Sequence, residues 1–203
     1  ARLPAARQTL LFSATMPPEI QRLTHEILKS PMVVQVAHSA PVASVAHALY
    51  PVAQSLKTTF LLALLNHIDR ESVLIFTRTK HRAKRLAEQL KQAEHPAACL
   101  QGNLSQNQRQ AAMDGFRSGR YRILVATDIA ARGIDVSTIS HVINFDMPDT
   151  VDAYTHRIGR TGRAAKTGDA FTLVTPEDDG MVRAIERVLN SRLERRRLEG
   201  FNY

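Results

Sequence analysis

Residues 73–78 read Val73-Leu74-Ile75-Phe76-Thr77-Arg78, and this stretch decides the fold class. Four apolar residues in a row, instead of an alternation of apolar and polar ones, are typical of a strand covered on both faces. Ile123-Leu124-Val125 has the same character. Strands of this kind form parallel sheets with helices packed against both faces, so the sequence predicts an α/β fold.

Strand and helix patterns alternate along the chain from residue 45 onward. The expected strands cover residues 47–53, 72–77, 97–101, 121–126, 140–145 and 169–175. Helical periods fill the gaps, as at Ala83, Leu86 and Leu90, which share one face because they are spaced i, i+3 and i+7. Right-handed crossovers between the parallel strands then place helices on both faces of the sheet.

The two ends of the chain follow other patterns. Residues 10–12 and 32–36 are short apolar stretches that we expect to be strands. A helix is expected to begin at the proline pair 17–18 and to run to about residue 29, because proline suits the first turn of a helix. Residues 37–44 are typical of a linker, and the arginine-rich residues 191–203 predict a basic helical extension or tail.

Composition narrows the partners of the protein. The 203 residues have a formal charge of +8, which favours a polyanionic partner, although a generically basic domain also fits this charge. Aromatic residues make up 5% and tryptophan is absent, which argues against a platform for base stacking. The single cysteine, Cys99, excludes an internal disulfide and is expected in the core. With no signal peptide, zinc spacing or membrane-spanning stretch, the expectation is a cytoplasmic protein without a metal site or membrane contact.

Polar motifs directly follow three of the expected strands, at Thr77-Arg78, Gln101-Gly102 and Thr127-Asp128. In parallel α/β sheets, ligands bind beyond the carboxyl ends of the strands, where helix N-termini also attract anions. Ser105 and Gln108 have the spacing of a capping box, which predicts a helix that starts there. Gln106 and Arg109 then point the same way from its first turn.

Residues 156–163 read His-Arg-Ile-Gly-Arg-Thr-Gly-Arg, so that Arg157, Arg160 and Arg163 recur at every third position. The planar, permanently charged guanidinium suits phosphate oxygens and the charge that develops in phosphoryl transfer. Gly159 and Gly162 keep the backbone thin beside a bulky triphosphate. Taken alone, this octapeptide also fits a solvated basic helix end.

Five stretches together resemble, in order and spacing, motifs III, IV, the Q-x-x-R element, V and VI of the DEAD-box ATP-dependent RNA helicases. They are Ser13-Ala14-Thr15 and residues 76–79, 101–109, 126–135 and 156–163. The resemblance covers essentially the whole chain. The residues at 76–82 and 200–203 are most similar to those of the bacterial RhlE-like branch. Gln101 stands where many members of the family have histidine, which leaves a base contact at this position open.

The resemblance implies a RecA-like parallel sheet with helices on both faces. Residues 1–36 correspond to the end of a first RecA-like domain, with the motif III strand and the following helix, and residues 37–44 to the interdomain linker. Residues 45–190 correspond to the helicase C-terminal RecA-like domain, and residues 191–203 to a basic extension.

The resemblance also implies roles for individual residues. Contacts to RNA are expected from Thr77, Arg78, Gly102, Gln106, Arg109, Thr127 and Asp128. Gly133 and Asp135 are expected at the ATP ribose, and Arg160 and Arg163 as catalytic arginine fingers that bind the γ-phosphate. Coupling between RNA and hydrolysis is expected from Ser13, Thr15, Arg132, His156 and Arg157.

The motifs that hold ATP and Mg²⁺ in this family do not occur in the chain, which has neither a G-x-x-x-x-G-K-[ST] loop nor an Asp-Glu-Ala-Asp tetrad. We therefore expect the N-terminal RecA-like domain to hold ATP and Mg²⁺, and this chain alone not to hydrolyse ATP. Two alternatives stay open: a stand-alone RNA-binding or dimerisation module, and a DNA helicase domain of the same superfamily.

Overall fold

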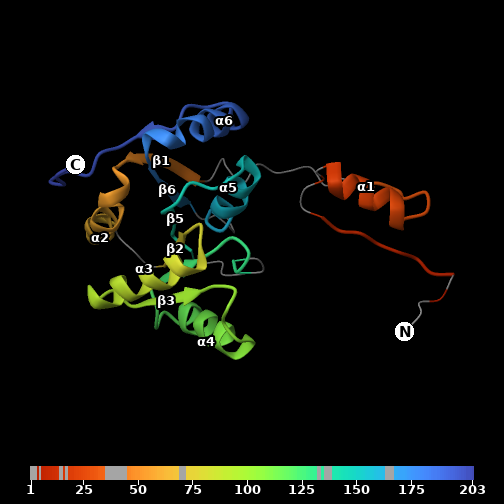
Figure 1. Cartoon of the computed structure of the whole chain (residues 1–203), viewed down its shortest axis with the longest axis horizontal. Helices are drawn as coiled ribbons and strands as arrows, with labels where there is room; N and C mark the ends of the chain where they lie inside the picture. The colour runs from red at the N-terminus through yellow and green to blue at the C-terminus, as the bar shows by residue number, and fades with distance from the viewer. Residues whose placement is uncertain are drawn as a thin grey trace. The chain divides into compact units, whose positions relative to one another are not determined.

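The computed structural model describes residues 4, 6–13, 16, 18–34, 45–68, 72–131, 134, 139–162 and 167–203. The chain divides into two compact units, Ala1–Ser39 and Ala40–Tyr203 (Figure 1). The expected linker at residues 37–44 lies outside the described residues.

The first unit contains the helix α1 (Pro18–Ile27), as the proline pair predicts. The strand predicted at residues 10–12 is wrong, and residues 32–34 of the second predicted strand are not extended into a sheet either. Leu10, Phe12 and Met32 are 66%, 90% and 89% exposed, so their apolar side chains pack against little in the unit. A strand needs a neighbour for its backbone hydrogen bonds, and the described residues of this unit provide none.

In the described part of the second unit, seven parallel strands form one sheet in the order β3-β4-β2-β5-β6-β1-β7. The strands are β1 (Val45–Pro51), β2 (Val73–Phe76), β3 (Ala97–Leu100), β4 (Ile123–Ala126), β5 (His141–Asn144), β6 (Gly168–Val174) and β7 (Glu194–Arg195). The predicted parallel α/β fold is confirmed, and β1 to β6 differ from the expected strands by one or two residues at their ends.

Helices cover both faces of this sheet. The first face is covered by α2 (Lys57–His67), which follows the 3-10 helix η1 (Gln54–Leu56), and by α3 (Lys80–Gln92). The second is covered by α4 (Gln106–Arg117), α5 (Val151–Ile158) and α6 (Asp179–Leu189), which follows η2 (Pro176–Asp178). Among the helices that the structure describes, none is both long and apolar enough to cross a membrane.

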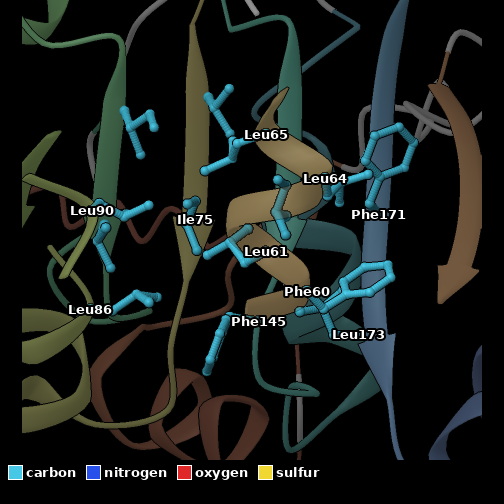
Figure 2. Packing of buried hydrophobic residues seen from close by; sticks show 14 of the residues in the cluster. Phe60, Leu61, Leu64, Leu65, Ile75, Leu86, Leu90, Phe145, Phe171 and Leu173 are labelled. Atoms are coloured by element: carbon cyan, nitrogen blue, oxygen red, sulfur yellow. The ribbon is translucent and has the colours of Figure 1, made fainter. Parts of the chain in front are cut away.

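Alternate residues of each central strand belong to opposite layers of the core. Val73 and Ile75 of β2 pack with α2 and α3, whereas Leu74 and Phe76 pack on the α4 side. Figure 2 shows Ile75 beside the leucines of α2 in the first of these layers. Each fully buried side chain of this size stabilises the fold by about 1.5–3 kcal/mol, which is why the uninterrupted apolar strands specify a two-sided sheet.

Cys99 of β3 is half-buried against the α2–α3 layer, as expected for a core residue. Burial raises the pKa of its thiol to about 11, so the group stays protonated and unreactive at neutral pH.

The C-terminal segment differs from the predicted helical extension or tail. Glu194–Arg195 form β7, which pairs with β1, and the backbone N–H of Arg196 donates to Leu49 O at 2.8 Å. The rings of Phe201 and Tyr203 lie 5.0 and 5.8 Å from that of Phe60 in α2. The arginines dominate the composition of this segment, but its two aromatic anchors and an open sheet edge decide its conformation.

Candidate functional site

The three polar motifs that follow strands meet at one edge of the sheet. Thr77 follows β2, Gly102 follows β3 by one residue and Thr127 follows β4, and these strands are neighbours in the order β3-β4-β2. The backbone N–H of Thr77 donates to Ala126 O at 2.9 Å, which ties two of the motifs together. The predicted convergence at the carboxyl edge is therefore confirmed.

The start of α4 carries the predicted pair Gln106 and Arg109. Ser105 and Gln108 form the complete capping box, so the predicted helix start is confirmed. Gln106 and Arg109 line one pocket of about 150 Å³, which confirms that they share a face. The Nη2 of Arg109 donates to Ala130 O at 3.1 Å, and this bond holds the guanidinium beside the loop after β4.

Gln101 and Gly102, at the end of β3, have different roles. The buried Gln101 accepts a hydrogen bond at Oε1 from the backbone N–H of Asn103 at 2.7 Å, so its side chain supports the turn. A Cβ added at Gly102 meets no protein atom within 4 Å. The packing of the protein itself therefore does not require glycine here, and the open surface suits the close approach of a ligand.

The motif after β2 combines a buried threonine with an exposed arginine. Thr77 is fully buried, and its hydroxyl donates to Thr79 O at 3.3 Å, so its side chain faces the protein. Arg78 is exposed, and its Nε lies 3.3 Å from Asp149 Oδ1. An exposed ion pair of this kind exchanges readily, which leaves the Arg78 guanidinium accessible to a phosphate.

Asp146, two residues beyond the end of β5, holds several side chains of this edge in place. It is not among the site residues that the sequence predicts. Its buried carboxylate accepts a hydrogen bond from the Arg78 backbone N–H at 2.9 Å and pairs with the Arg82 guanidinium. Its backbone O accepts a bond of 2.7 Å from Arg157 Nη1. The rule that polar residues after buried strands form sites applied to Asp146 as well, since it follows the expected strand 140–145.

Arg157 of α5 is buried in the second unit, with its side chain only 2% exposed. Nε and Nη2 donate to the two oxygens of Asp128 at 2.6 and 2.7 Å, and Nη1 also donates to Asn144 Oδ1 at 3.1 Å. The guanidinium lies 5.1 Å from the centre of the Phe76 ring. This bidentate pair fastens α5 to the loop after β4, and it commits the carboxylate of Asp128 to Arg157.

Arg160 lies just after α5, with a half-buried side chain held by backbone carbonyls. Its Nη1 donates to Ile134 O at 3.1 Å and its Nε to His156 O at 3.3 Å, while His156 itself is exposed. The arginine motif and the motif after β4 are thus joined twice, through Arg157 and through Arg160.

Thr161 anchors the turn that carries Arg160, and no pattern in the sequence pointed to this role. Its buried hydroxyl lies 2.6 Å from Ile139 O and 3.1 Å from Ser140 O. A Cβ added at Gly168 meets Thr161 Oγ1 at 2.1 Å, so this close approach excludes any larger residue. The turn after α5 is therefore fixed against the amino ends of β5 and β6, at the edge of the sheet opposite to the polar motifs.

Five predicted site residues lie outside the described residues, namely Thr15, Arg132, Gly133, Asp135 and Arg163. Ser13 is exposed and belongs to the first unit. Among the residues that the structure describes, no group of three or more His, Cys, Asp or Glu side chains is placed to hold a metal ion.

The parallel sheet, covered on both faces and carrying the polar motifs at one edge, is a RecA-like α/β domain. A comparison with known families matches residues 56–165, more than half of the chain, to the helicase conserved C-terminal domain. The chain therefore belongs to the helicase conserved C-terminal domain family, as the C-terminal domain of a DEAD-box protein.

Two curated relatives illustrate this family. The DEAD-box ATP-dependent RNA helicase CshA of Geobacillus kaustophilus is 43% identical over 196 residues, which cover 96% of this chain and 42% of that protein. The RNA helicase CrhR of Synechocystis sp. is 45% identical over 195 residues, or 95% of this chain and 40% of that protein. The chain thus spans less than half the length of these relatives.

Solved structures of DEAD-box proteins have the same fold. S. cerevisiae Dbp5 bound to RNA and ADP BeF3 matches with a TM-score of 0.84 at 29% identity, over 96% of this chain and 52% of that chain. E. coli SrmB bound to regulator of ribonuclease activity A matches with a TM-score of 0.71 at 36% identity, over 76% of this chain and 91% of that chain. The assignment to the RhlE-like branch stays a prediction.

Proposed function

We propose that the protein is an ATP-dependent RNA helicase in which this chain supplies one wall of the RNA site and one wall of the ATP site. The observation that carries the proposal is the double connection between the arginine motif and the loop after β4, through Arg157–Asp128 and Arg160–Ile134. That loop follows β4, which lies between the two strands β3 and β2 that carry the other candidate RNA contacts. A change at the RNA site is therefore transmitted to the arginine motif over a short distance.

The RNA wall is the carboxyl edge of β3, β4 and β2. Arg109 and Arg78 provide charge for backbone phosphates, and Gly102, Gln106 and Thr127 provide an open surface and polar groups between them. Contacts to phosphate and sugar carry no sequence information, which suits a helicase that acts on many RNAs. Thr77 supports this wall from inside the protein and Asp128 from the loop after β4, since their polar groups already have protein partners.

The ATP wall contains Arg160 and, by its place in the same motif, Arg163. Guanidinium groups that reach a transferring phosphoryl group stabilise the negative charge of the transition state. We propose that an N-terminal RecA-like domain holds ATP and Mg²⁺, and that Gly133 and Asp135 of this chain contact the ribose. Closure of the two domains then bends one RNA strand away from its duplex partner in a local strand separation.

The remaining assignments belong to the same proposal. Residues 1–36 complete the N-terminal RecA-like domain, residues 37–44 link the two domains, and Ser13, Thr15, Arg132 and His156 couple RNA binding to hydrolysis. Arg157 contributes to this coupling through the loop that Asp128 anchors. A cytoplasmic location is the corresponding expectation for the cell.

The isolated 203-residue chain should bind RNA weakly and show no ATP hydrolysis above background, with or without RNA, because it forms only one wall of each site. The measurement is phosphate release by the purified chain at increasing RNA concentration. Robust turnover that disappears in Arg160→Ala would contradict the proposal, because the chain would then hold a complete ATP site.

Arg109→Ala should weaken binding to all single-stranded RNAs alike, because Arg109 is expected to contact a phosphate. We expect the slope of log K against log salt to fall by about 0.7, the value for one phosphate contact on a single strand. Fluorescence anisotropy with oligonucleotides of different sequence measures this slope, and Arg187→Ala on α6 is the control of equal charge. A preference for one sequence that persists at high salt would contradict backbone recognition, and equal binding of single-stranded DNA would favour the DNA helicase alternative.

A further inference from the structure

A second polar pocket, of about 310 Å³, opens between the start of α2 and the first turns of α3. Ser55 of η1 and Thr58 of α2 line one side, and Arg82 and Arg85 of α3 line the other. Leu86 and Phe145, both labelled in Figure 2, also line the pocket and join it to the core. None of these residues belongs to the RNA wall or the ATP wall described above.

The charge of α3 is unusual for the beginning of a helix. Lys80, Arg82, Lys84 and Arg85 are all exposed within its first six residues, and its first turn contains no acidic residue. The positive end of the helix dipole disfavours cations there, and the four cations also repel one another. An arrangement that costs stability in the free protein is relieved when an anion binds beside it.

The four cations of this group differ in their partners. Arg82 pairs with Asp146, Lys80 donates to Asn103 Oδ1 at 3.2 Å, and Lys84 lies 4.0 Å from Glu88 Oε1. Among the residues that the structure describes, Arg85 makes no ion pair or hydrogen bond with any side chain. Its five N–H donors are therefore available to an anion in the pocket.

The pocket continues the surface of the RNA wall. The carboxylate of Asp146 accepts one bond from the backbone of Arg78, at the RNA wall, and another from the guanidinium of Arg82, at the pocket. A single buried side chain thus touches both places. Arg78 and Arg82 therefore lie close together, and Arg82 and Arg85 line the same pocket.

We propose that the α2–α3 pocket binds a backbone phosphate of the RNA segment that flanks the strand held at the sheet edge. Arg85 provides the charge, and the hydroxyls of Ser55 and Thr58 lie on the opposite side as additional donors. The inference rests on the proposed RNA-binding function. RNA is favoured over an acidic protein segment because the pocket adjoins a surface that already presents Arg78 and Arg109 for phosphates.

The test compares a short with a long RNA on the 203-residue chain. Oligouridines of about 6 and about 15 nucleotides bracket the usual site sizes for single strands. We expect Arg85→Ala to weaken binding of the long RNA about fivefold at low salt and to lower its salt slope by about 0.7, with no change for the short RNA. Arg183→Ala, an exposed arginine of α6, removes the same charge and is expected to change neither affinity.

Arg109→Ala in the same assay separates the two levels of the proposal. If it weakens both RNAs while Arg85→Ala affects neither or both equally, the RNA wall stands and the flanking site is wrong. If Arg109→Ala affects neither RNA, the proposed function fails, and the flanking site fails with it. Thermal unfolding of each variant verifies that the exposed substitutions leave the fold intact.

Discussion

Arg160→Lys should slow RNA-stimulated ATP hydrolysis by about a hundredfold or more in a protein that contains both RecA-like domains, a loss of roughly 3 kcal/mol in barrier lowering. Lysine keeps the charge but loses the planar fork that binds two oxygens at once. The bonds from Arg160 to Ile134 O and His156 O use that fork, so the position of the charge is lost together with its shape. Arg163→Lys is expected to have an effect of the same size.

RNA affinity, measured on the same proteins, is the internal control for this experiment. It should change by less than about twofold, because a lysine still attracts phosphate. Arg183→Lys on α6 provides a matched substitution away from both sites, and it should leave both hydrolysis and affinity unchanged. Normal hydrolysis by Arg163→Lys with a collapse of RNA binding would mean that the motif is a nucleic-acid patch and that the arginine fingers are wrongly assigned.

Arg157→Met should lower the free energy of unfolding of the 203-residue chain by about 2–4 kcal/mol, chiefly because two buried acceptors are left without a hydrogen-bond donor. Methionine fills the space beside Phe76 but donates no hydrogen bond. Asn144 Oδ1 and Asp146 O then lose a donor, and Asp128 loses its counter-charge. Urea denaturation followed by circular dichroism measures this change.

Two control variants define what the loss in Arg157→Met means. Asp128→Asn should cost less, because the amide oxygen of asparagine, Asn144 Oδ1 and Asp146 O still accept hydrogen bonds from the Arg157 guanidinium. Arg183→Met on α6 should be close to neutral, since that arginine is exposed. A loss below about 1 kcal/mol in Arg157→Met would show that the buried pair matters little for stability.

The milder Arg157→Lys, in the two-domain protein, should impair RNA stimulation of hydrolysis more than basal turnover.

The bonds of Asp146 and Arg157 explain how two walls of different chemistry belong to one domain. Asp146 holds the backbone of Arg78 at the RNA wall, and its carbonyl accepts a bond from Arg157. Arg157 in turn holds Asp128 in the loop after β4. Buried polar groups that satisfy one another in this way keep the loops in one arrangement, which prepares both walls for their ligands.

Local patterns in the sequence determined the sheet, its helices and the edge where the motifs meet. Uninterrupted apolar strands are stable only between two layers, and parallel strands bring their carboxyl ends to the same edge, so both features follow from short stretches of chain. The capping box at Ser105 was equally predictable, because both of its members lie within one turn. The patterns misled at residues 10–12 and after residue 190, where apolar or basic composition did not specify a packing partner.

Only the tertiary structure decided what the individual polar side chains do. Asp128 and Arg157 are 29 residues apart, and Arg82 and Asp146 are 64 apart, so no local pattern pairs them. The same holds for Thr77, whose hydroxyl faces inward although its place in the motif suggested an RNA contact. A side chain's partner depends on which strands become neighbours and on how far each side chain reaches across them, and this geometry exists only once the sheet has formed.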